Sequence, residues 1–297
     1  MNSNANRVFL LVKSARPLQW MKNIVVLAPL VFAHKLMDRD LFTKAVIAFL
    51  VFCLVASATY LLNDLKDREK DRLHPVKKNR PIAAGLLGPW SVFPAAIALT
   101  LTGLATSYYF LGLDFSTWIV VYILVQTAYS FGLKGVIIID VFTVSAGYVV
   151  RVVGGAVAIH VPASAWLILC TLLLSLFLSL AKRRHEILLL GDMAEDHRKS
   201  LVQYDRSLLD QMVGVVAPAT VIAYALYTLD PDTVKRFGGQ GLFYTVPMVL
   251  YGLFRYMYLV HAKRKGGEPD KTLLTDTALL LDVLLYAILV IALIYLR

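Results

Sequence analysis

The feature that most constrains this chain is a series of long apolar stretches that recurs along nearly its whole length. A helix needs about 20 apolar residues to cross about 30 Å of hydrocarbon. The chain has 297 residues, of which 58% are hydrophobic and 17% charged, and its mean hydropathy is +0.66. These values lie outside the range of ordinary soluble domains. The sequence therefore predicts an all-α integral membrane protein.

Nine apolar stretches are long enough to predict transmembrane helices. They cover residues 20–34, 42–62, 90–111, 117–133, 137–158, 164–181, 212–229, 241–260 and 278–296. The connections after the second, sixth and eighth stretches are longer and charged. We expect a single polytopic domain over residues 1–297, in which the connections at about 63–89, 182–211 and 261–277 form a polar cap.

The basic residues are distributed unevenly between the two sides of this predicted membrane domain. With the N-terminus in the cytoplasm, 23 of the 30 Lys and Arg residues face the cytoplasm, and Arg151 lies inside the fifth span. The other six face the opposite side: Lys35, Arg39, Lys44, Lys235, Arg236 and Arg297. Because bases concentrate on the cytoplasmic side of membrane proteins, this asymmetry predicts the orientation. The net charge of +10 then reflects topology and anionic lipid rather than nucleic acid.

A group of acidic residues, "NDLKDREKD", directly follows the second apolar stretch. If the helix continues into this group, Asn63, Asp67 and Asp71 recur every four residues along one face, with Asp64 beside the first. Three carboxylates this close repel one another unless a cation holds them. Oxygen ligands without nearby His or Cys favour Mg²⁺, which is typically shared with substrate phosphates. We therefore predict that Asn63, Asp64, Asp67 and Asp71 bind Mg²⁺.

The bases of the same connection, Lys77 and Arg80 among them, are interpreted as phosphate ligands. Arg can bind a phosphate group through two parallel hydrogen bonds. The alternative is a solvated helix end, in which Asp67 pairs with neighbours such as Arg68 or Lys70 for about 0.2–0.5 kcal/mol per pair. The apolar sequence "ATYLL" directly before the acidic group favours the metal site, because charge at a membrane boundary is costly.

The acidic group followed by "RPIAAG" resembles the first aspartate-rich motif of the UbiA superfamily of intramembrane prenyltransferases. The nine-span layout is similar as well. This resemblance implies a helical bundle with a central cavity that opens laterally to lipid, where Mg²⁺ holds a diphosphate against cytoplasmic cap helices. It also implies catalytic roles for Asp64, Asp67 and Asp71.

Four further stretches narrow this resemblance and extend it over most of the chain: "RPLQWMKN", "YSFGLK", "AKRRHEILLLGDMAEDHRKSLVQY" and "GGEPD". Typical prenyltransferases of the superfamily carry a second aspartate motif after the sixth span. Asp192 and Asp196 imitate its spacing here, but bases dominate the stretch. The pattern is similar to the branch that transfers phosphoribose to a polyprenyl phosphate in the bacterial inner membrane, for cell wall biosynthesis.

The branch resemblance implies roles for polar residues around the predicted cap. Lys182 is expected to bind substrate phosphate and Glu186 to orient it or to bind ribose hydroxyls, both as catalytic residues. Further expected substrate-binding residues are Lys22, Tyr129, Lys134, Arg183, Arg198, Lys199, Tyr204 and Arg255. For the bases, the alternative is a collar that lies against anionic lipid.

Two charged residues, Asp140 and Arg151, lie inside the fifth predicted span. They are 11 residues apart, which is about three helical turns, so they share a face that must point into the bundle. A functional role and a structural ion pair with neighbouring helices both remain open. The two cysteines, Cys53 and Cys170, lie in apolar spans, which argues against a disulfide framework or a cysteine metal site.

The predicted reaction is the Mg²⁺-dependent transfer of 5-phosphoribosyl from phosphoribosyl diphosphate to a polyprenyl phosphate. The nearest alternative is a prenyltransferase that moves an isoprenoid from its diphosphate to an aromatic or other small acceptor. A non-enzymatic carrier of lipid phosphates is a third possibility, although we find no inverted repeats of the kind such carriers use. The expected partners are the two substrates and the bilayer, without nucleic acid, and homo-oligomers remain open.

Overall fold

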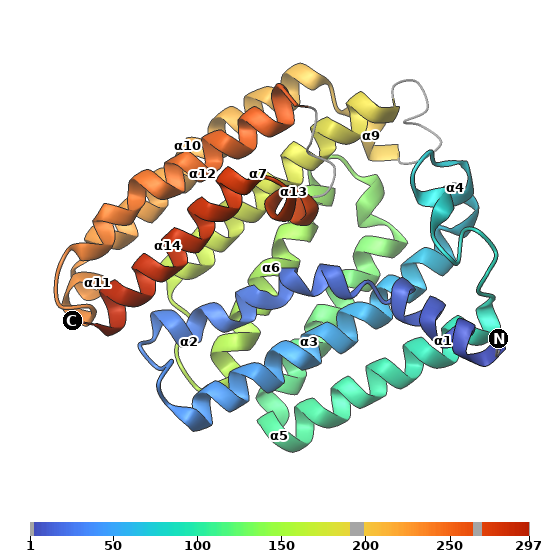
Figure 1. The fold of residues 1–297 in the computed structure, drawn as a ribbon, viewed down its shortest axis with the longest axis horizontal. Helices are drawn as coiled ribbons and strands as arrows, with labels where there is room; N and C mark the ends of the chain where they lie inside the picture. Colours follow the sequence, from blue (N-terminus) through green and yellow to red (C-terminus); the bar gives the residue numbers. More distant parts are fainter. Residues whose placement is uncertain (1–2, 191–198, 264–268, 297) are drawn as a thin grey trace.

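The computed structural model describes residues 3–190, 199–263 and 269–296, and in these ranges the chain forms only helices and their connections. In chain order the elements are α1 (Ser3–Ser14), η1 (Pro17–Leu27), α2 (Ala28–Phe32), α3 (Arg39–Lys66), α4 (Arg68–Leu73), η2 (Lys77–Asn79), α5 (Pro89–Phe131), η3 (Leu133–Gly135), α6 (Ile139–Ala158), α7 (Ala165–Leu190), α9 (Lys199–Gln203), α10 (Arg206–Leu229), α11 (Pro231–Arg236), η5 (Gly241–Thr245), α12 (Val246–His261), α13 (Pro269–Thr275) and α14 (Thr277–Tyr295). Figure 1 shows α10, α12 and α14 on one side of the bundle and α3 and α5 on the other. The all-α prediction is confirmed.

Six of the described helices are long and apolar enough to cross a membrane: α3, α5, α6, α7, α10 and α14. Helix α5 has 43 residues and contains both the third and the fourth predicted span, which meet at Gly112 with φ 82° and ψ −177°. Glycine adopts such a positive φ without a steric penalty. The first and eighth predicted spans correspond to η1 with α2 and to η5 with α12, which are shorter. Nine spans therefore remain a prediction.

Aspartate side chains begin three of the long helices. Asp38, Asp205 and Asp276 precede α3, α10 and α14, and each accepts hydrogen bonds from backbone N–H groups two or three residues later, at 3.0 to 3.2 Å. Such caps satisfy donors that a helix cannot pair internally. They define where these apolar helices start.

The interior between α3, α5 and α6 is closely packed. Phe52 on α3 makes edge-on contacts with Phe115 and Tyr122 on α5, with ring centroids 5.9 and 5.4 Å apart. At Gly155 on α6, a β-carbon would lie only 2.1 Å from the carbonyl oxygen of Val26 on η1. The lack of a side chain at Gly155 therefore lets η1 lie directly against α6 and brings the N-terminal arm into the bundle.

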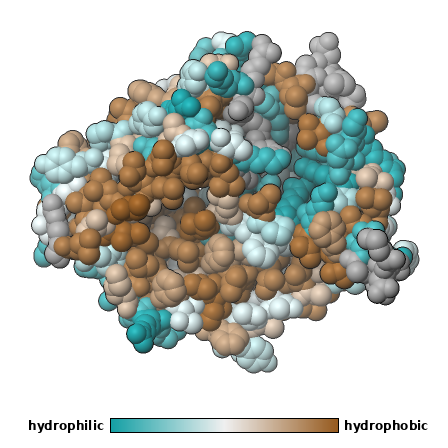
Figure 2. Space-filling model, viewed as in Figure 1, coloured by the Kyte–Doolittle hydropathy of each residue, from teal (hydrophilic) through white to brown (hydrophobic). Residues whose placement is uncertain are grey.

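Polar and apolar side chains are segregated on the surface. Figure 2 shows hydrophobic side chains over the part of this face formed by α14, α2 and α3, and hydrophilic side chains gathered toward the α4 end. The apolar part suits contact with lipid. The polar end is where α3 stops and where the acidic group lies.

Candidate functional site

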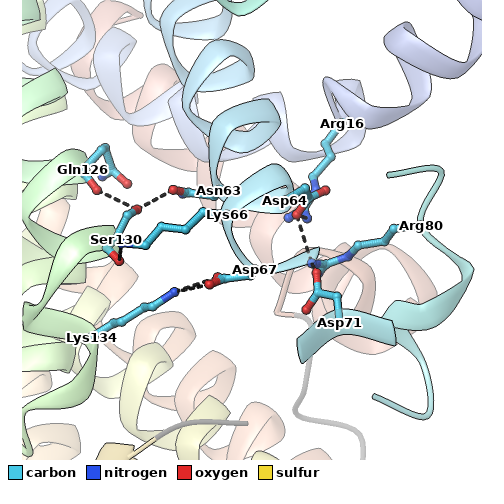
Figure 3. A network of polar contacts seen from close by, with 10 residues as sticks. All are labelled: Arg16, Asn63, Asp64, Lys66, Asp67, Asp71, Arg80, Gln126, Ser130 and Lys134. Atoms are coloured by element: carbon cyan, nitrogen blue, oxygen red, sulfur yellow. Dashed lines mark hydrogen bonds and ion pairs between the residues drawn. The ribbon is translucent and has the colours of Figure 1, made fainter. Parts of the chain in front are cut away.

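The acidic group spans a break between two helices. Helix α3 ends at Lys66, Asp67 has φ −90° and ψ 8°, and α4 begins at the next residue. Asn63 and Asp67 face α5 and η3, whereas Asp64 and Asp71 point toward Arg80 (Figure 3). The expectation that Asn63, Asp67 and Asp71 share one face is therefore wrong, because the helix does not continue through Asp67.

Asp64 and Asp71 are bound by the same cationic side chain. One guanidinium nitrogen of Arg80 lies 3.0 Å from Asp64 Oδ1 and 2.6 Å from Asp71 Oδ2. Arg16, from the N-terminal arm, also pairs with Asp64. Burial raises the pKa of the Asp71 carboxyl above its ordinary value, although Arg80 and Lys77 oppose that rise. The two carboxylates thus converge on one positive charge.

The other half of the acidic group is held by residues from α5 and η3. Lys134 Nζ lies 2.6 and 2.7 Å from the two carboxylate oxygens of Asp67. Ser130 donates its hydroxyl hydrogen bond to the side-chain oxygen of Asn63, and Lys66 donates to the carbonyl oxygen of Ser130 at 2.7 Å. The break after α3 is thereby tied to a segment more than 60 residues later in the chain.

The donor chemistry of this aspartate cluster, Asn63, Asp64, Asp67 and Asp71, fits a hard divalent cation. Within the described ranges, no three His, Cys, Asp or Glu side chains are grouped as ligands of one ion. Two oxygens, from Asp64 and Asp71, nevertheless already meet around a single cationic nitrogen. Mg²⁺ commonly takes only one or two protein carboxylates and completes its shell with water and substrate phosphate. The residues present therefore fit such an ion.

A second charged group lies next to the aspartate cluster, where the predicted connection at 182–211 begins. Lys182 on α7 is within electrostatic range of charged residues from η1, η2 and α7: Lys22, Lys77, Arg183 and Glu186. Lys77 also interacts with Asp71, so the two groups adjoin. We name Lys22, Lys77, Lys182 and Arg183 the basic cluster. Its excess positive charge can attract phosphate groups.

Arg183 is buried and joins the basic cluster to α5 and α6. Its guanidinium donates to Asp140 Oδ2 at 2.8 Å, to Glu186 Oε2 at 2.5 Å and to the Tyr129 hydroxyl at 3.2 Å. The Arg183 and Asp140 side chains are only 3% and 0% exposed. The structure thus brings three predicted site residues, Tyr129, Arg183 and Glu186, into one network around Asp140.

Tyr204 and Ser200 complete the shell around Asp140. The Tyr204 hydroxyl donates to Asp140 Oδ1 at 2.8 Å, and the Ser200 hydroxyl lies 3.4 Å from Asp140 Oδ2. Burial raises the pKa of the Tyr204 phenol well above its ordinary value, and the Asp140 carboxylate adds to that rise. Tyr204 therefore stays a hydrogen-bond donor to a buried carboxylate.

Arg151 is buried as expected, but it does not pair with Asp140. Its donors reach Asn23 Oδ1 at 2.7 Å, the Gly147 carbonyl oxygen at 2.8 Å and the Tyr122 hydroxyl at 2.8 Å. Among the described residues, no carboxylate forms an ion pair with Arg151. Neutral oxygens and the Tyr122 ring, 4.6 Å from its guanidinium carbon, hold this charge in the bundle interior.

Some predicted residues lie apart from these groups. Arg255 on α12 pairs with both oxygens of Asp276 at 2.8 and 3.0 Å and so ties α12 to the start of α14. Asp192, Asp196 and Arg198 lie outside the described residues, and for Lys199 only the backbone is described.

Arg16 was not among the residues predicted for the site. It lies directly before Pro17 in "RPLQWMKN" and has φ 57°, a left-handed conformation that is uncommon for residues other than glycine. Its position in that stretch, which carries part of the family resemblance, was the sequence signal that could have pointed to Arg16 as a site residue. Ser130 and Ser200 carried no local signal, since a serine hydroxyl is unremarkable until its partners are known.

Comparison with known proteins assigns the chain to a family. The model of the UbiA prenyltransferase family matches residues 24–275. The chain belongs to the UbiA prenyltransferase family. As a member of it, with several apolar helices, the chain is a multi-pass membrane enzyme.

Curated relatives are similar over nearly the whole chain. It is 36% identical over 283 residues to decaprenyl-phosphate phosphoribosyltransferase of Mycolicibacterium smegmatis, covering 92% of this chain and 89% of that protein. The protein of the same name from Corynebacterium glutamicum is 37% identical over 274 residues, 91% of this chain and 82% of the relative. The branch resemblance is thereby confirmed.

Solved structures show the same fold. A UbiA homologue from Archaeoglobus fulgidus, bound to GPP and Mg²⁺, superimposes with a TM-score of 0.74 at 16% identity and covers 96% of this chain and 99% of that one. Digeranylgeranylglyceryl phosphate synthase matches with a TM-score of 0.66 at 17% identity, over 97% and 99% of the two chains. At this identity the likeness establishes the fold alone.

Proposed function

We propose that this protein transfers 5-phosphoribosyl from phosphoribosyl diphosphate to a polyprenyl phosphate, releasing diphosphate. The observation that carries the proposal is the identity of 36–37% to decaprenyl-phosphate phosphoribosyltransferases over about nine-tenths of the chain. The basic cluster beside the aspartate cluster supports it. Donor and acceptor together bring several phosphate groups, which need more positive charge than one metal ion supplies.

The aspartate cluster is proposed to hold the diphosphate end of the donor. Asp64 and Asp71, with Asn63 and Asp67, would bind Mg²⁺. When bound there, the ion would stabilise the charge that develops on the diphosphate leaving group. Arg80 would then exchange its carboxylate partners for phosphate oxygens, because its side chain is 30% exposed and close to both.

The basic cluster is proposed to orient the acceptor phosphate. Lys182 would hold that phosphate, while Glu186, held in place by Arg183, receives ribose hydroxyl hydrogen bonds. An acceptor oxygen then attacks the anomeric carbon as the bond from this carbon to the diphosphate breaks, with inversion. Since the acceptor oxygen is already anionic, the step needs no general base. The role of these side chains is to place charge where it develops.

An apolar groove next to these residues suits the isoprenoid tail. It has a volume of about 570 Å³ and is lined by residues of α5, η3, α6 and α7: Leu124, Val125, Ala128, Leu133, Ile139, Phe142, Thr143, Ala146 and Leu172. Ala128, Leu133 and Ile139 are direct sequence neighbours of Tyr129, Lys134 and Asp140. We propose that the tail of the acceptor lies along this groove.

The proposed orientation follows from the distribution of bases. The aspartate cluster, the basic cluster and the connections at 63–89, 182–211 and 261–277 would form a cytoplasmic cap, with the N-terminus on the same side. The membrane would be the bacterial inner membrane. Phosphoribosyl diphosphate would enter from the cytoplasm and the acceptor from the bilayer.

The test is an incubation of purified protein in detergent with polyprenyl phosphate, Mg²⁺ and phosphoribosyl diphosphate labelled in the pentose. We expect the label to enter the lipid phase and a chelator to abolish that transfer. A matched Asp67→Asn variant controls for contaminating activity. If folded protein in the presence of Mg²⁺ gives no label in the lipid phase, the proposal is contradicted.

A further inference from the structure

The turn that joins α5 to α6 has an unusual backbone at Ile138. This residue has φ 67° and ψ −49°, a positive φ that a β-branched side chain strongly disfavours. Such a conformation persists only where surrounding contacts enforce it, and these sites are often functional. The turn therefore needs an external support.

That support comes from α9 and the residue that follows it. The backbone N–H of Ile138 donates to the Tyr204 hydroxyl at 2.8 Å, and the same hydroxyl donates to Asp140 Oδ1 at 2.8 Å. Ser200 donates to the carbonyl oxygen of Lys134 at 2.9 Å. Ser200 and Tyr204 are 0% and 4% exposed. Two buried hydroxyls thus hold both ends of the turn.

The held turn carries Lys134, whose ammonium group contacts Asp67 of the aspartate cluster at 2.6 Å. The contacts form one chain from Ser200 through the backbone and side chain of Lys134 to Asp67. A shift of the turn would move the ammonium group relative to Asp67. Displacements of about 1 Å at such sites are costly to binding and catalysis.

We propose that Ser200 and Tyr204 are positioning residues that set Lys134 for binding diphosphate at the aspartate cluster. The Tyr204 hydroxyl is buried and already engaged as both donor and acceptor, so its role is exerted through the turn rather than by contact with substrate. This inference rests on the proposed function only in that the site binds diphosphate. It does not depend on which group is transferred.

The experiment measures binding rather than turnover. Full-length protein in detergent is titrated with inorganic diphosphate in the presence of Mg²⁺ by isothermal titration calorimetry, and the half-saturating concentration is recorded. The variants are Tyr204→Phe, Ser200→Ala, Lys134→Met and the double variant Tyr204→Phe/Lys134→Met. The matched control is Tyr224→Phe, a buried tyrosine whose hydroxyl is bonded to Thr245 at 2.6 Å and to Tyr286 at 3.0 Å.

We expect Tyr204→Phe and Ser200→Ala to raise the half-saturating concentration about tenfold, and Lys134→Met to raise it further. The double variant should bind no worse than Lys134→Met, since residues that act through one another are not additive. Tyr224→Phe should leave the concentration unchanged. If Tyr204→Phe does not fold, Ser200→Ala carries the test alone.

Three results would overturn the proposal: unchanged binding in the folded variants, additive losses in the double variant, or an equal loss in Tyr224→Phe. Each is separate from the transfer assay. A protein that moved a prenyl group instead of phosphoribose would still bind diphosphate and would give the expected pattern.

Discussion

Two ion pairs at the junction of α5 and α6 differ in accessibility: one contains Lys134 of η3 and the other Asp140 near the start of α6. In the pair of Lys134 with Asp67, the side chains are 28% and 32% exposed. In the pair of Arg183 with Asp140, they are 3% and 0% exposed. Both pairs have short contacts, at 2.6 and 2.8 Å.

The difference indicates which charges can exchange partners. An accessible pair gains little net energy from its contact, about 0–1 kcal/mol, so its members are available to a ligand. A buried pair is costly to break, because the remaining charge stays without water or a partner. We infer that Lys134 and Asp67 serve binding, while Arg183 and Asp140 fix the framework on which binding occurs.

The largest expected effect is on the buried pair. Asp140→Asn leaves the Arg183 guanidinium without its carboxylate and should destabilise the fold by about 3–5 kcal/mol. The measurement is the thermal unfolding of detergent-purified protein. Asp114→Asn, at an exposed residue of α5, is the matched control and should change Tm little. Equal stability of the Asp140 and Asp114 variants would contradict the framework role.

Neutralising the carboxylates of the aspartate cluster is predicted to remove activity, and at the accessible Asp67 to do so without loss of fold. Asp64→Asn, Asp67→Asn and Asp71→Asn should each lower the transfer rate by about 10²-fold or more, because charge stabilisation at the leaving group is lost. Thermal unfolding of the same preparations should stay close to that of the unaltered protein for Asp67→Asn in particular. Near-normal rates in all three variants would remove the metal-site assignment.

A smaller effect is expected from pH. Only the ionised carboxylate binds a cation, and burial raises the pKa of Asp71. As pH falls through that raised pKa, the Mg²⁺ concentration for half-maximal activity should rise, by up to about tenfold per pH unit. If Asp71→Asn retains measurable activity with the same pH dependence, Asp71 is not the titrating ligand.

The smallest effect is predicted for a third pair of intermediate exposure. The Arg255 and Asp276 side chains are 30% and 14% exposed, and their contact joins α12 to α14. Arg255→Ala should lower Tm slightly and change the transfer rate less than about twofold. A loss of transfer rate as large as that expected for Asp67→Asn would contradict this and would place Arg255 in the substrate site, as its sequence context suggested.

Much of the fold could be predicted from the sequence because apolar length is a local property. The stretches that form α3, α6 and α14 could be located from hydropathy alone, and the burial of Asp140 and Arg151 from their spacing. The break at Gly112 lies in the gap between the third and fourth predicted spans, so it too agrees with the hydropathy pattern. The ends of η1 and α12, by contrast, depend on packing rather than on composition.

The candidate site was only partly predictable, for a physical reason. The acidic residues could be identified, but their partners could not, since Asp67 binds Lys134 from a distant segment rather than its neighbours Arg68 or Lys70. Asp140 similarly pairs with Arg183, not with Arg151 on its own helix. Long-range ion pairs are determined by how helices pack, which local spacing does not encode.

The most direct test of the account compares two donors with one preparation of purified protein and Mg²⁺. One arm contains labelled phosphoribosyl diphosphate with polyprenyl phosphate, and the other contains labelled prenyl diphosphate with an aromatic acceptor. We predict transfer only in the first arm, and its loss in the Asp67→Asn variant. Transfer only in the second arm would contradict the account and identify the protein as a prenyltransferase.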